Sequence, residues 1–196
     1  ALNGSAYDLN IEMFNRLQRS ITGWPGGKPN SDDKYRPERA NPNPKRVIIF
    51  SPHPDDDVIS MGGTFDRLVS QGHEVHIVYQ TSGNIAVSDQ DALKYLEVTS
   101  DFIKPKLDPA INSLKKIFLE RNPNKPAPKS ICDLKGTIRK RESLGATRYF
   151  SIPDEQVHFM NLPFYETGTI AKKPISNDDV DLTITIIEKI KPHQIF

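Results

Sequence analysis

Two apolar runs on either side of a helical pattern constrain the fold of this chain more than any other feature. Residues 46–50 read RVIIF and residues 74–81 read EVHIVYQT, and such short runs are typical of strands that are covered on both faces of a parallel sheet. Residues 58–72, between them, predict a helix that ends at Gly72. The apolar positions of this helix are Ile59, Phe65, Leu68 and Val69. Strand, helix and strand within about 35 residues predict a βαβ unit with parallel strands and a right-handed crossover.

The same alternation continues along the rest of the sequence. Helices are predicted at residues 91–103, 111–120, 135–150 and 177–191, and strands at residues 156–164 and 193–196. The predicted buried residues of the helix at 135–150 are Ile138, Leu144 and Tyr149. Asn177 or Asp178 is the predicted N-cap of the helix at 177–191. Alternating strands and helices predict an α/β fold with a Rossmann-like, open, doubly wound and mostly parallel sheet.

The first 44 residues predict an attachment to this domain. Residues 9–21 predict a short helix, whereas residues 20–44 are dominated by proline, glycine and polar residues and predict an arm or linker. We therefore expect an N-terminal helix and arm at 1–44 and one domain at 45–196. Because HQIF at the end reads as a strand that has just begun, we expect the sheet to be truncated and the C-terminal part of the domain to be missing from these 196 residues.

Composition argues against several classes of protein. The formal net charge is +1, from 26 Lys and Arg against 25 Asp and Glu, so charge gives no reason to expect a nucleic acid or a membrane surface as partner. The single cysteine, Cys132, excludes an internal disulfide and favours a reducing compartment. The sequence contains neither a signal peptide nor an apolar run long enough to span a bilayer. We therefore expect a cytoplasmic protein.

A histidine and three consecutive acids follow the first predicted strand directly, in the stretch HPDDD at residues 53–57. Ligands of open α/β sheets bind outside the carboxyl ends of the strands, so this turn lies where a site is expected. Adjacent carboxylates repel one another, and a bound divalent cation would offset that repulsion. His53 and Asp56, three residues apart, can point at one ion. An imidazole nitrogen and a carboxylate oxygen suit zinc, with iron or cobalt as alternatives.

The other two acids of the turn have different predicted roles. Asp55 is available as a general base, whereas Asp57 stands where a helix N-cap would and is predicted to support the turn. The alternative is that the acids only cap the helix and face solvent, which is the usual role of Asp before a helix. Two features favour a site over simple capping. The His-Pro-Asp-Asp order follows a buried strand directly, and Gly62 and Gly63 permit close approach of the backbone.

The stretch HPDDDVISMGG resembles the His-Pro-Asp-Asp-Glu signature of the zinc-dependent N-acetylglucosaminyl deacetylases, the PIG-L or LmbE-like family, with Asp57 in place of the usual Glu. The likeness extends from about residue 45 to residue 196. It includes the TSG after the second predicted strand, an Arg-x-x-Glu at residues 139–142 and the KPHQIF near the end. The first motif is specific, and the others are weak alone. The resemblance implies metal-dependent hydrolysis of the N-acetyl group of an N-acetylglucosamine derivative.

The same resemblance implies roles for individual residues. Matched residue by residue, His53 and Asp56 become ligands of zinc or another divalent transition metal. Asp55 becomes the general base for the attacking water. Arg139 and Glu166 become substrate-binding residues.

Two further parts of the resemblance concern the ends of the sequence. The family's third metal ligand belongs to a His-x-x-His motif after the strand that KPHQIF resembles, so it is expected beyond Phe196, and the activity is expected to be incomplete in these 196 residues. The arm resembles the region that joins such a domain to an N-terminal glucosamine-6-phosphate deaminase-like domain in some bacterial two-domain proteins. This resemblance implies an amino-sugar substrate and a deaminase-like domain in the same polypeptide.

Other functions stay open from the sequence. A non-catalytic sugar-phosphate binding or assembly domain would keep the turn without the reaction. A nucleotide-binding role is disfavoured, because acids rather than G-x-G-x-x-G follow the first strand and would repel a pyrophosphate. His73, His76 and His158 are predicted to be structural or surface histidines, since the first two face opposite sides of one strand. Ser82 lacks a G-x-S-x-G elbow and is predicted to lie in a turn near the metal.

Overall fold

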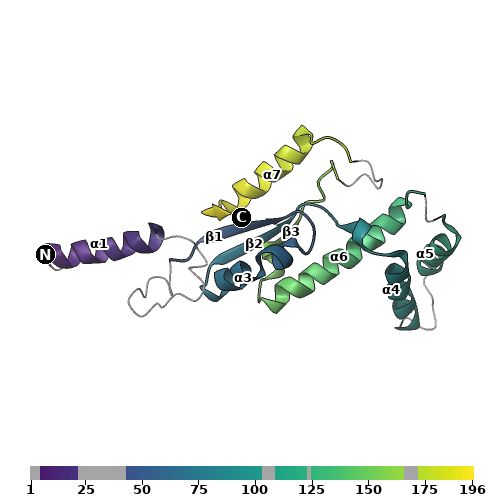
Figure 1. Cartoon of the computed structure of the whole chain (residues 1–196), viewed down its shortest axis with the longest axis horizontal. Coiled ribbons are helices and arrows are strands. Elements are labelled where there is room, and N and C mark those ends of the chain that lie inside the picture. Colours follow the sequence, from purple (N-terminus) through teal and green to yellow (C-terminus); the bar gives the residue numbers. More distant parts are fainter. Residues whose placement is uncertain (1–4, 22–42, 103–108, 123–124, 166–171) are drawn as a thin grey trace.

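The computed structural model describes residues 5–21, 43–102, 109–122, 125–165 and 172–196, with the backbone alone at 14–21. These residues form an α/β fold on a four-stranded, all-parallel sheet, as the sequence predicted (Figure 1). The strands are β1 (Arg46–Ser51), β2 (Glu74–Tyr79), β3 (Val157–Phe159) and β4 (Gln194–Ile195). The helices are α1 (Ala6–Ile21), α3 (Asp56–Ser70), α4 (Asp89–Phe102), α5 (Pro109–Glu120), α6 (Lys129–Tyr149) and α7 (Asn177–Ile190), with 3₁₀ turns η2 (Asn84–Ala86) and η3 (Asp154–Gln156). Within the described ranges, no helix has both the length and the apolar character needed to cross a membrane.

The strand order β3-β2-β1-β4 places the first strand inside the sheet. β1 pairs in parallel with β2 along its whole length, from Arg46 opposite Glu74 to Ser51 opposite Tyr79. The chain proceeds from β1 to β2 and β3 on one side, whereas β4 pairs with β1 on the other side, so the order reverses at β1. Such a switch point is where open α/β sheets bind ligands, outside the carboxyl ends of the strands.

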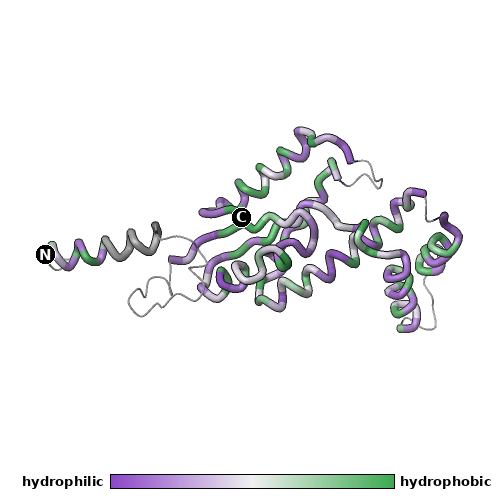
Figure 2. Tube along the Cα trace, viewed as in Figure 1, coloured by the Kyte–Doolittle hydropathy of each residue, from purple (hydrophilic) through white to green (hydrophobic). Residues whose placement is uncertain are grey.

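Helices cover both faces of the sheet, so the sheet is doubly wound (Figure 1). Val47 and Ile49 of β1 pack with α3 and α6 on one face, whereas Ile48 packs with Ile190 of α7 on the other. Successive side chains of a strand point to opposite faces. Because both faces are covered, all three of these β1 side chains are fully buried. Figure 2 shows the resulting hydrophobic stretches in the central strands. Coverage on both sides is the reason that β1 reads as a continuous apolar run.

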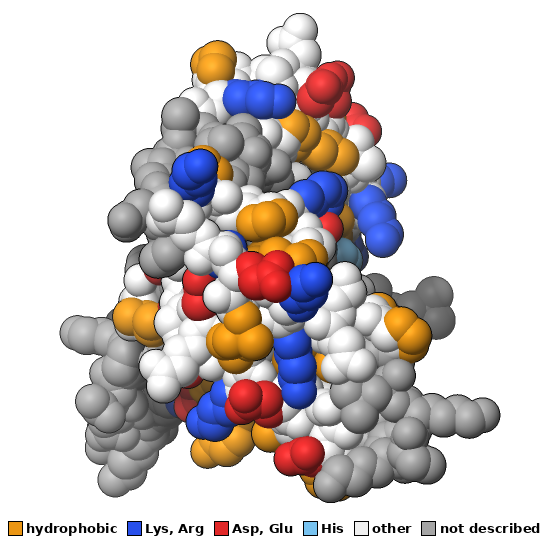
Figure 3. All heavy atoms as spheres, turned by 90° about the vertical axis from the view of Figure 1, so that its right-hand side faces the viewer, with side chains coloured by type: hydrophobic (Ala, Val, Ile, Leu, Met, Phe, Trp, Pro, Cys, Tyr) orange, Lys and Arg blue, Asp and Glu red, His pale blue; other side chains and the backbone are white. Residues whose placement is uncertain are grey.

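Helix α6 connects this core to a second one. Its C-terminal half packs under the sheet through Leu144, and its N-terminal half packs with α4 and α5 through Ile138. Asp89 at the start of α4 pairs with Arg121 after α5 and with Lys135 of α6, the latter at 2.7 Å. Figure 3 views this end of the molecule, where basic and acidic side chains are interspersed with hydrophobic ones. The pair of helices α4 and α5 is therefore held to the sheet through α6.

Two elements, α6 and β3, differ most from their predicted ranges. Helix α6 begins at Lys129 rather than at residue 135, directly after Pro128, because a proline disrupts the interior of a helix but is tolerated at its start. β3 covers only part of the predicted strand at 156–164, because Pro163 opens a turn. Helix α1 contains the predicted helix at 9–21, and residues 22–42 of the predicted arm lie outside the described part of the chain.

The N-cap of α7 also differs from the prediction. Ser176 is the N-cap, and it forms a capping box with Asp179 in which each side chain pairs with the other residue's backbone N–H. The prediction of Asn177 or Asp178 is therefore wrong. The serine was missed because two good capping residues follow it directly.

Most of the apolar helix positions named from the sequence are buried, and two are not. Phe65, Leu68, Ile138 and Leu144 are buried, and Val69 is partly buried. Tyr149 is 84% exposed, because the chain ends α6 there and Phe150 packs on Phe65 instead, with their ring centroids 4.6 Å apart. Ile59 is 75% exposed, since it lies roughly 120° around the helix from Phe65 and so points away from the core.

The three histidines that were predicted to be structural make hydrogen bonds within the fold. His73 is buried, and its Nδ1 accepts a backbone N–H at 3.1 Å. His76 is also buried, with Glu74 Oε1 2.9 Å from its Nε2 and His158 Nε2 3.1 Å from its Nδ1. Burial, together with the nearby His76 and Lys189, lowers the pKa of His158 to about 4.

We predict that His158 makes the fold sensitive to acid. Its pKa is about 4 in the folded protein and about 6.5 in an unfolded chain, so unfolding takes up a proton between these values. The stabilisation is complete above about pH 6.5 and is lost as the pH falls toward 4. Urea unfolding should therefore show a steeper loss of unfolding free energy in this range for the wild type than for His158→Gln. Parallel curves for the two proteins would contradict the prediction.

Candidate active site

The acidic turn begins where β1 ends and finishes where α3 begins. It comprises residues 52–57, from the end of β1 through the first two residues of α3, beside the switch point of the sheet. Asp55 donates its backbone N–H to the carbonyl of His53 at 2.8 Å and stands at the N-cap position of α3. The turn thus brings His53 and the acids to the carboxyl edge of the sheet.

His53 and Asp56 lie against each other in this turn. The Nδ1 atom of His53 is 3.1 Å from Oδ2 of Asp56, and the backbone N–H of His53 donates to the same oxygen at 2.9 Å. Two ligand atoms of a tetrahedral zinc ion are separated by roughly 3.4 Å, because each lies about 2.0–2.2 Å from the metal, and a small movement brings this pair to that spacing. The side chains of His53 and Asp56 are 42% and 33% exposed, so an ion can reach them. The two residues predicted to share a metal are therefore spaced to do so.

Asp55 is held by an arginine from α6. The Nη2 atom of Arg139 lies 2.8 Å from Oδ2 of Asp55, and its Nη1 lies 3.9 Å from Oε2 of Glu142. The Arg139 side chain is 15% exposed, and its buried Nε has no hydrogen-bond partner among the described residues. The ion pair engages Oδ2 and orients Asp55.

Asp57 turns inward and is buried. The Tyr79 hydroxyl donates to its Oδ2 at 2.9 Å, and the Ser51 hydroxyl accepts its backbone N–H at 3.0 Å and lies 3.3 Å from its Oδ1. Burial raises the pKa of Asp57, although the hydrogen bonds from Tyr79 and Ser51 oppose that effect. Burial and the neighbouring Asp57 also raise the pKa of Tyr79. The prediction that Asp57 is the N-cap is wrong, because Asp55 takes that position while Asp57 faces the core.

Each of the three acids thus has a protein partner of its own. These partners are Arg139 for Asp55, His53 for Asp56 and Tyr79 for Asp57. Because the side chains diverge, the repulsion between neighbouring carboxylates does not by itself require a cation, contrary to the prediction from sequence. The spacing of His53 and Asp56 is what favours a metal ion. The described residues contain no group of three or more His, Cys, Asp or Glu side chains that could hold one.

One neighbour of His53 was missed by the sequence reasoning. The hydroxyl of Tyr165 lies 3.2 Å from Nε2 of His53. The only signal in the sequence was its place beside Glu166, which was predicted to bind substrate and lies outside the described residues. The contact joins residues that are 112 positions apart, so no local pattern reports it.

The TSG motif after β2 packs between the turn and α6. Gly83 has φ of +63°, and a Cβ there would lie 2.7 Å from Cδ of Pro54 and 3.3 Å from Nε of Arg139. On the other side, a Cβ on Gly136 of α6 would lie 3.2 Å from Cβ of Ser82. The two glycines therefore allow the loop to approach both neighbours closely. Ser82 lies in the loop between β2 and η2, beside the candidate site.

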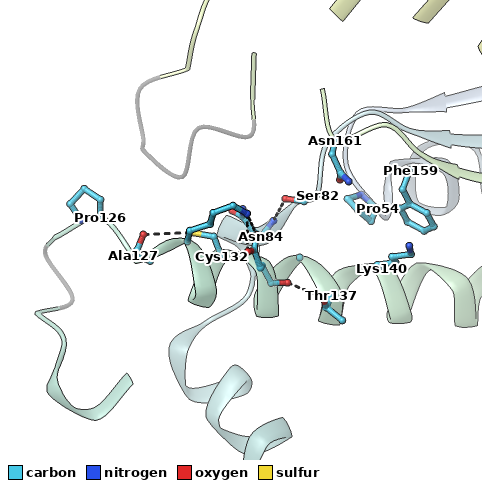
Figure 4. A pocket seen from close by; sticks show the side chains of 13 residues that line it. Pro54, Ser82, Asn84, Pro126, Ala127, Cys132, Thr137, Lys140, Phe159 and Asn161 are labelled. Atoms are coloured by element: carbon cyan, nitrogen blue, oxygen red, sulfur yellow. Dashed lines mark hydrogen bonds and ion pairs between the residues drawn. The ribbon is translucent and has the colours of Figure 1, made fainter. Parts of the chain in front are cut away.

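A cavity of about 640 Å³ adjoins the acidic turn (Figure 4). Its lining includes Pro54 of the turn, Asn84 from the loop after β2, Lys140 of α6, and Phe159 and Asn161 at the end of β3. The Nζ of Lys140 lies 4.7 Å from the centroid of the Phe159 ring. Cavities of this size hold small molecules, and this one offers an aromatic ring, two amides and a cation.

A family model described as PIG-L, GlcNAc-PI de-N-acetylase, matches residues 48–196. The chain belongs to the PIG-L family. The matched region begins within β1 and contains the acidic turn, α6 and β4. PIG-L membership confirms the resemblance seen in HPDDD, and it supports N-acetylglucosamine-type deacetylase activity in general terms.

A curated relative is similar along the whole chain. It is a protein of Bacteroides thetaiotaomicron that carries the name glucosamine-6-phosphate deaminase-like protein, and the identity is 53% over 203 aligned residues. The alignment covers 100% of the present chain and 31% of the relative. The PIG-L domain and the residues before it thus span about a third of the length of that relative.

Replacing Gly83 by alanine should displace the turn from α6. The added Cβ would overlap Pro54, and the positive φ of Gly83 would strain any L-residue, so we expect a loss of about 1–3 kcal/mol in the free energy of unfolding. Gly63→Ala is the matched control, because a Cβ there meets nothing within 4 Å and lies in helix α3. Urea unfolding of both variants measures the difference. Equal stability of the two would show that the close approach at Gly83 is not needed.

Proposed function

We propose that this chain is a metal-dependent deacetylase domain, which hydrolyses the N-acetyl group of an N-acetylglucosamine derivative. One observation carries the proposal: Nδ1 of His53 and Oδ2 of Asp56 lie 3.1 Å apart at the switch point of a PIG-L sheet. The family membership supports the reaction type. The spacing of the two ligand atoms supports the metal.

His53 and Asp56 would hold the metal ion. Zinc fits an imidazole nitrogen with a carboxylate oxygen best, and iron or cobalt would accept the same pair. Bound there, the ion would act as a Lewis acid toward the amide carbonyl and the attacking water. Catalytic zinc sites usually have three protein ligands, and the family resemblance implies a histidine of a His-x-x-His motif as the third.

Asp55 would act as the general base. Arg139 binds its Oδ2, so Oδ1 is the atom that would take a proton from water. The water oxygen then bonds to the carbonyl carbon. The proton on Asp55 would pass to the amide nitrogen as the C–N bond breaks, so acetate and a free amine result and Asp55 is again ionised. Asp57 would support this turn from the core through Ser51 and Tyr79.

The cavity beside the turn would hold the amino sugar. Phe159 lines this cavity with the Nζ of Lys140 over its ring, and Asn84 and Asn161 offer amide groups for the sugar hydroxyls. Arg139 is proposed to contact the substrate beside Asp55, which its Nη2 already binds at 2.8 Å. Glu166 is proposed as a further sugar-binding residue.

The whole protein would combine two activities. We propose that the arm at 1–44 joins the deacetylase domain at 45–196 to a deaminase-like domain of the same polypeptide. The name and the greater length of the Bacteroides relative support this arrangement. Removal of the acetyl group yields a free amine, which a deaminase can then remove, so the two reactions would act in sequence on one amino sugar. The proposed setting is the cytoplasm, without a nucleic acid or membrane partner.

Acetate release by the full-length protein tests the proposed reaction. N-acetylglucosamine, its 6-phosphate and chitooligosaccharides are supplied with zinc, and the wild type is compared with Asp55→Asn. Because an amide cannot take the proton from water, we expect the rate to fall by about a hundredfold or more.

Asp66→Asn is the matched control, because it makes the same change on an exposed residue of α3, the helix that Asp55 precedes. Its rate should equal that of the wild type. Unchanged activity in Asp55→Asn would refute the base assignment. Sugar binding by the wild type without acetate release from any substrate would favour the alternative, a non-catalytic sugar-phosphate binding or assembly domain.

A further inference from the structure

Tyr165 is the neighbour of His53 that the proposed reaction does not use. Its hydroxyl oxygen lies 3.2 Å from Nε2 of His53, and the two rings meet edge to face with centroids 5.6 Å apart. The other ring nitrogen, Nδ1, faces Asp56 at 3.1 Å. Both nitrogens of the proposed ligand therefore have a partner, and the partner of Nε2 is a side chain from the other end of the domain.

The fold fixes the position of this hydroxyl through several contacts. Tyr165 lies in the turn after β3, where its backbone N–H donates to the carbonyl of Leu162 at 3.0 Å. The preceding residue, Phe164, donates its N–H at 3.0 Å to the buried carboxylate of Asp179, which also forms the capping box of α7. Lys172 places its Nζ 3.3 Å from the centroid of the Tyr165 ring. The turn is thus anchored to the start of α7 and the ring is covered by a cation.

The anchor carboxylate is itself held in its charged form. Burial alone would raise the pKa of Asp179, but hydrogen bonds from the Phe164 and Ser176 backbones and from the Ser176 hydroxyl bring that pKa below its usual range. The turn that carries Tyr165 is therefore fixed at neutral pH.

A hydroxyl can both donate and accept a hydrogen bond, so it can pair with Nε2 of His53 both with and without a bound metal. The carboxylate of Asp56 only accepts hydrogen bonds, so in the metal-free pair the proton lies on Nδ1, and Nε2 accepts the hydrogen of the Tyr165 hydroxyl. A ligand that binds through Nδ1 carries its proton on Nε2 instead. In that case Nε2–H of His53 donates to the Tyr165 oxygen, and the hydroxyl hydrogen of Tyr165 rotates away. One proton moves from Nδ1 to Nε2, and none is gained or lost.

We propose that Tyr165 is a positioning residue that fixes His53 with Nδ1 toward Asp56 for metal binding. The inference rests on the proposed function, because it takes His53 and Asp56 as ligands of one divalent ion. Partners on the second nitrogen of a metal-binding histidine orient its ring, and their loss typically weakens metal affinity by about 10–100-fold. We expect a loss of that size when the Tyr165 hydroxyl is removed.

Zinc affinity of the full-length protein tests the inference without any measurement of catalysis. The apparent Kd is measured by competition with a chromophoric chelator for the wild type, His53→Gln, Tyr165→Phe and Tyr149→Phe. The difference between the wild type and His53→Gln defines the binding that belongs to this site. Tyr165→Phe keeps the ring and removes only the hydroxyl. Tyr149→Phe is the matched control, because Tyr149 is 84% exposed.

The outcomes separate the inference from the proposed function. A Kd raised about 10–100-fold in Tyr165→Phe, with Tyr149→Phe like the wild type and with equal metal-free melting temperatures, supports the positioning role. An unchanged Kd in Tyr165→Phe would overturn the inference and leave the metal site standing. Equal zinc binding by the wild type and His53→Gln would overturn the metal site, and the inference with it.

Discussion

The acidic turn holds together because its three carboxylates leave it in three directions. One meets the guanidinium of Arg139, one meets the imidazole of His53, and the side chain of Asp57 points into the core. Like charges that shared one direction would repel by about 1 kcal/mol in water and by more where they are partly buried. Because the side chains diverge, the proposed metal ligands His53 and Asp56 lie between the Asp55–Arg139 ion pair and the buried Asp57. The same few residues thus settle both the stability of the turn and the chemistry available to it.

Helix α6 connects the turn to the rest of the domain. Ile138 packs with α4 and α5, Leu144 packs under the sheet, and Arg139 between them reaches Asp55. The loop after β2 fits between α6 and the turn because Gly83 has no side chain to clash with Pro54. The candidate site therefore lies at the junction of two hydrophobic cores, and its geometry depends on the packing of both.

Local patterns in the sequence were sufficient for the central part of this fold. The β1–α3–β2 unit was predicted because apolar runs, a helical spacing and a terminal glycine each report their own segment. His53, Asp55 and Asp56 could be predicted as site residues because they are neighbours in the sequence. The inward turn of Asp57 was not predicted, because it depends on burial against Tyr79, a residue of the next strand. Tyr165 was missed for the same reason, since its contact with His53 spans 112 positions.

The central claim is that His53 and Asp56 share one metal ion at the carboxyl end of β1. A crystal structure of the full-length protein soaked in zinc, with anomalous data at the zinc edge, tests this most directly. We predict one strong anomalous peak at about 2.0–2.2 Å from both Nδ1 of His53 and Oδ2 of Asp56. Full zinc occupancy elsewhere in the protein, with no peak at this pair, would contradict the claim.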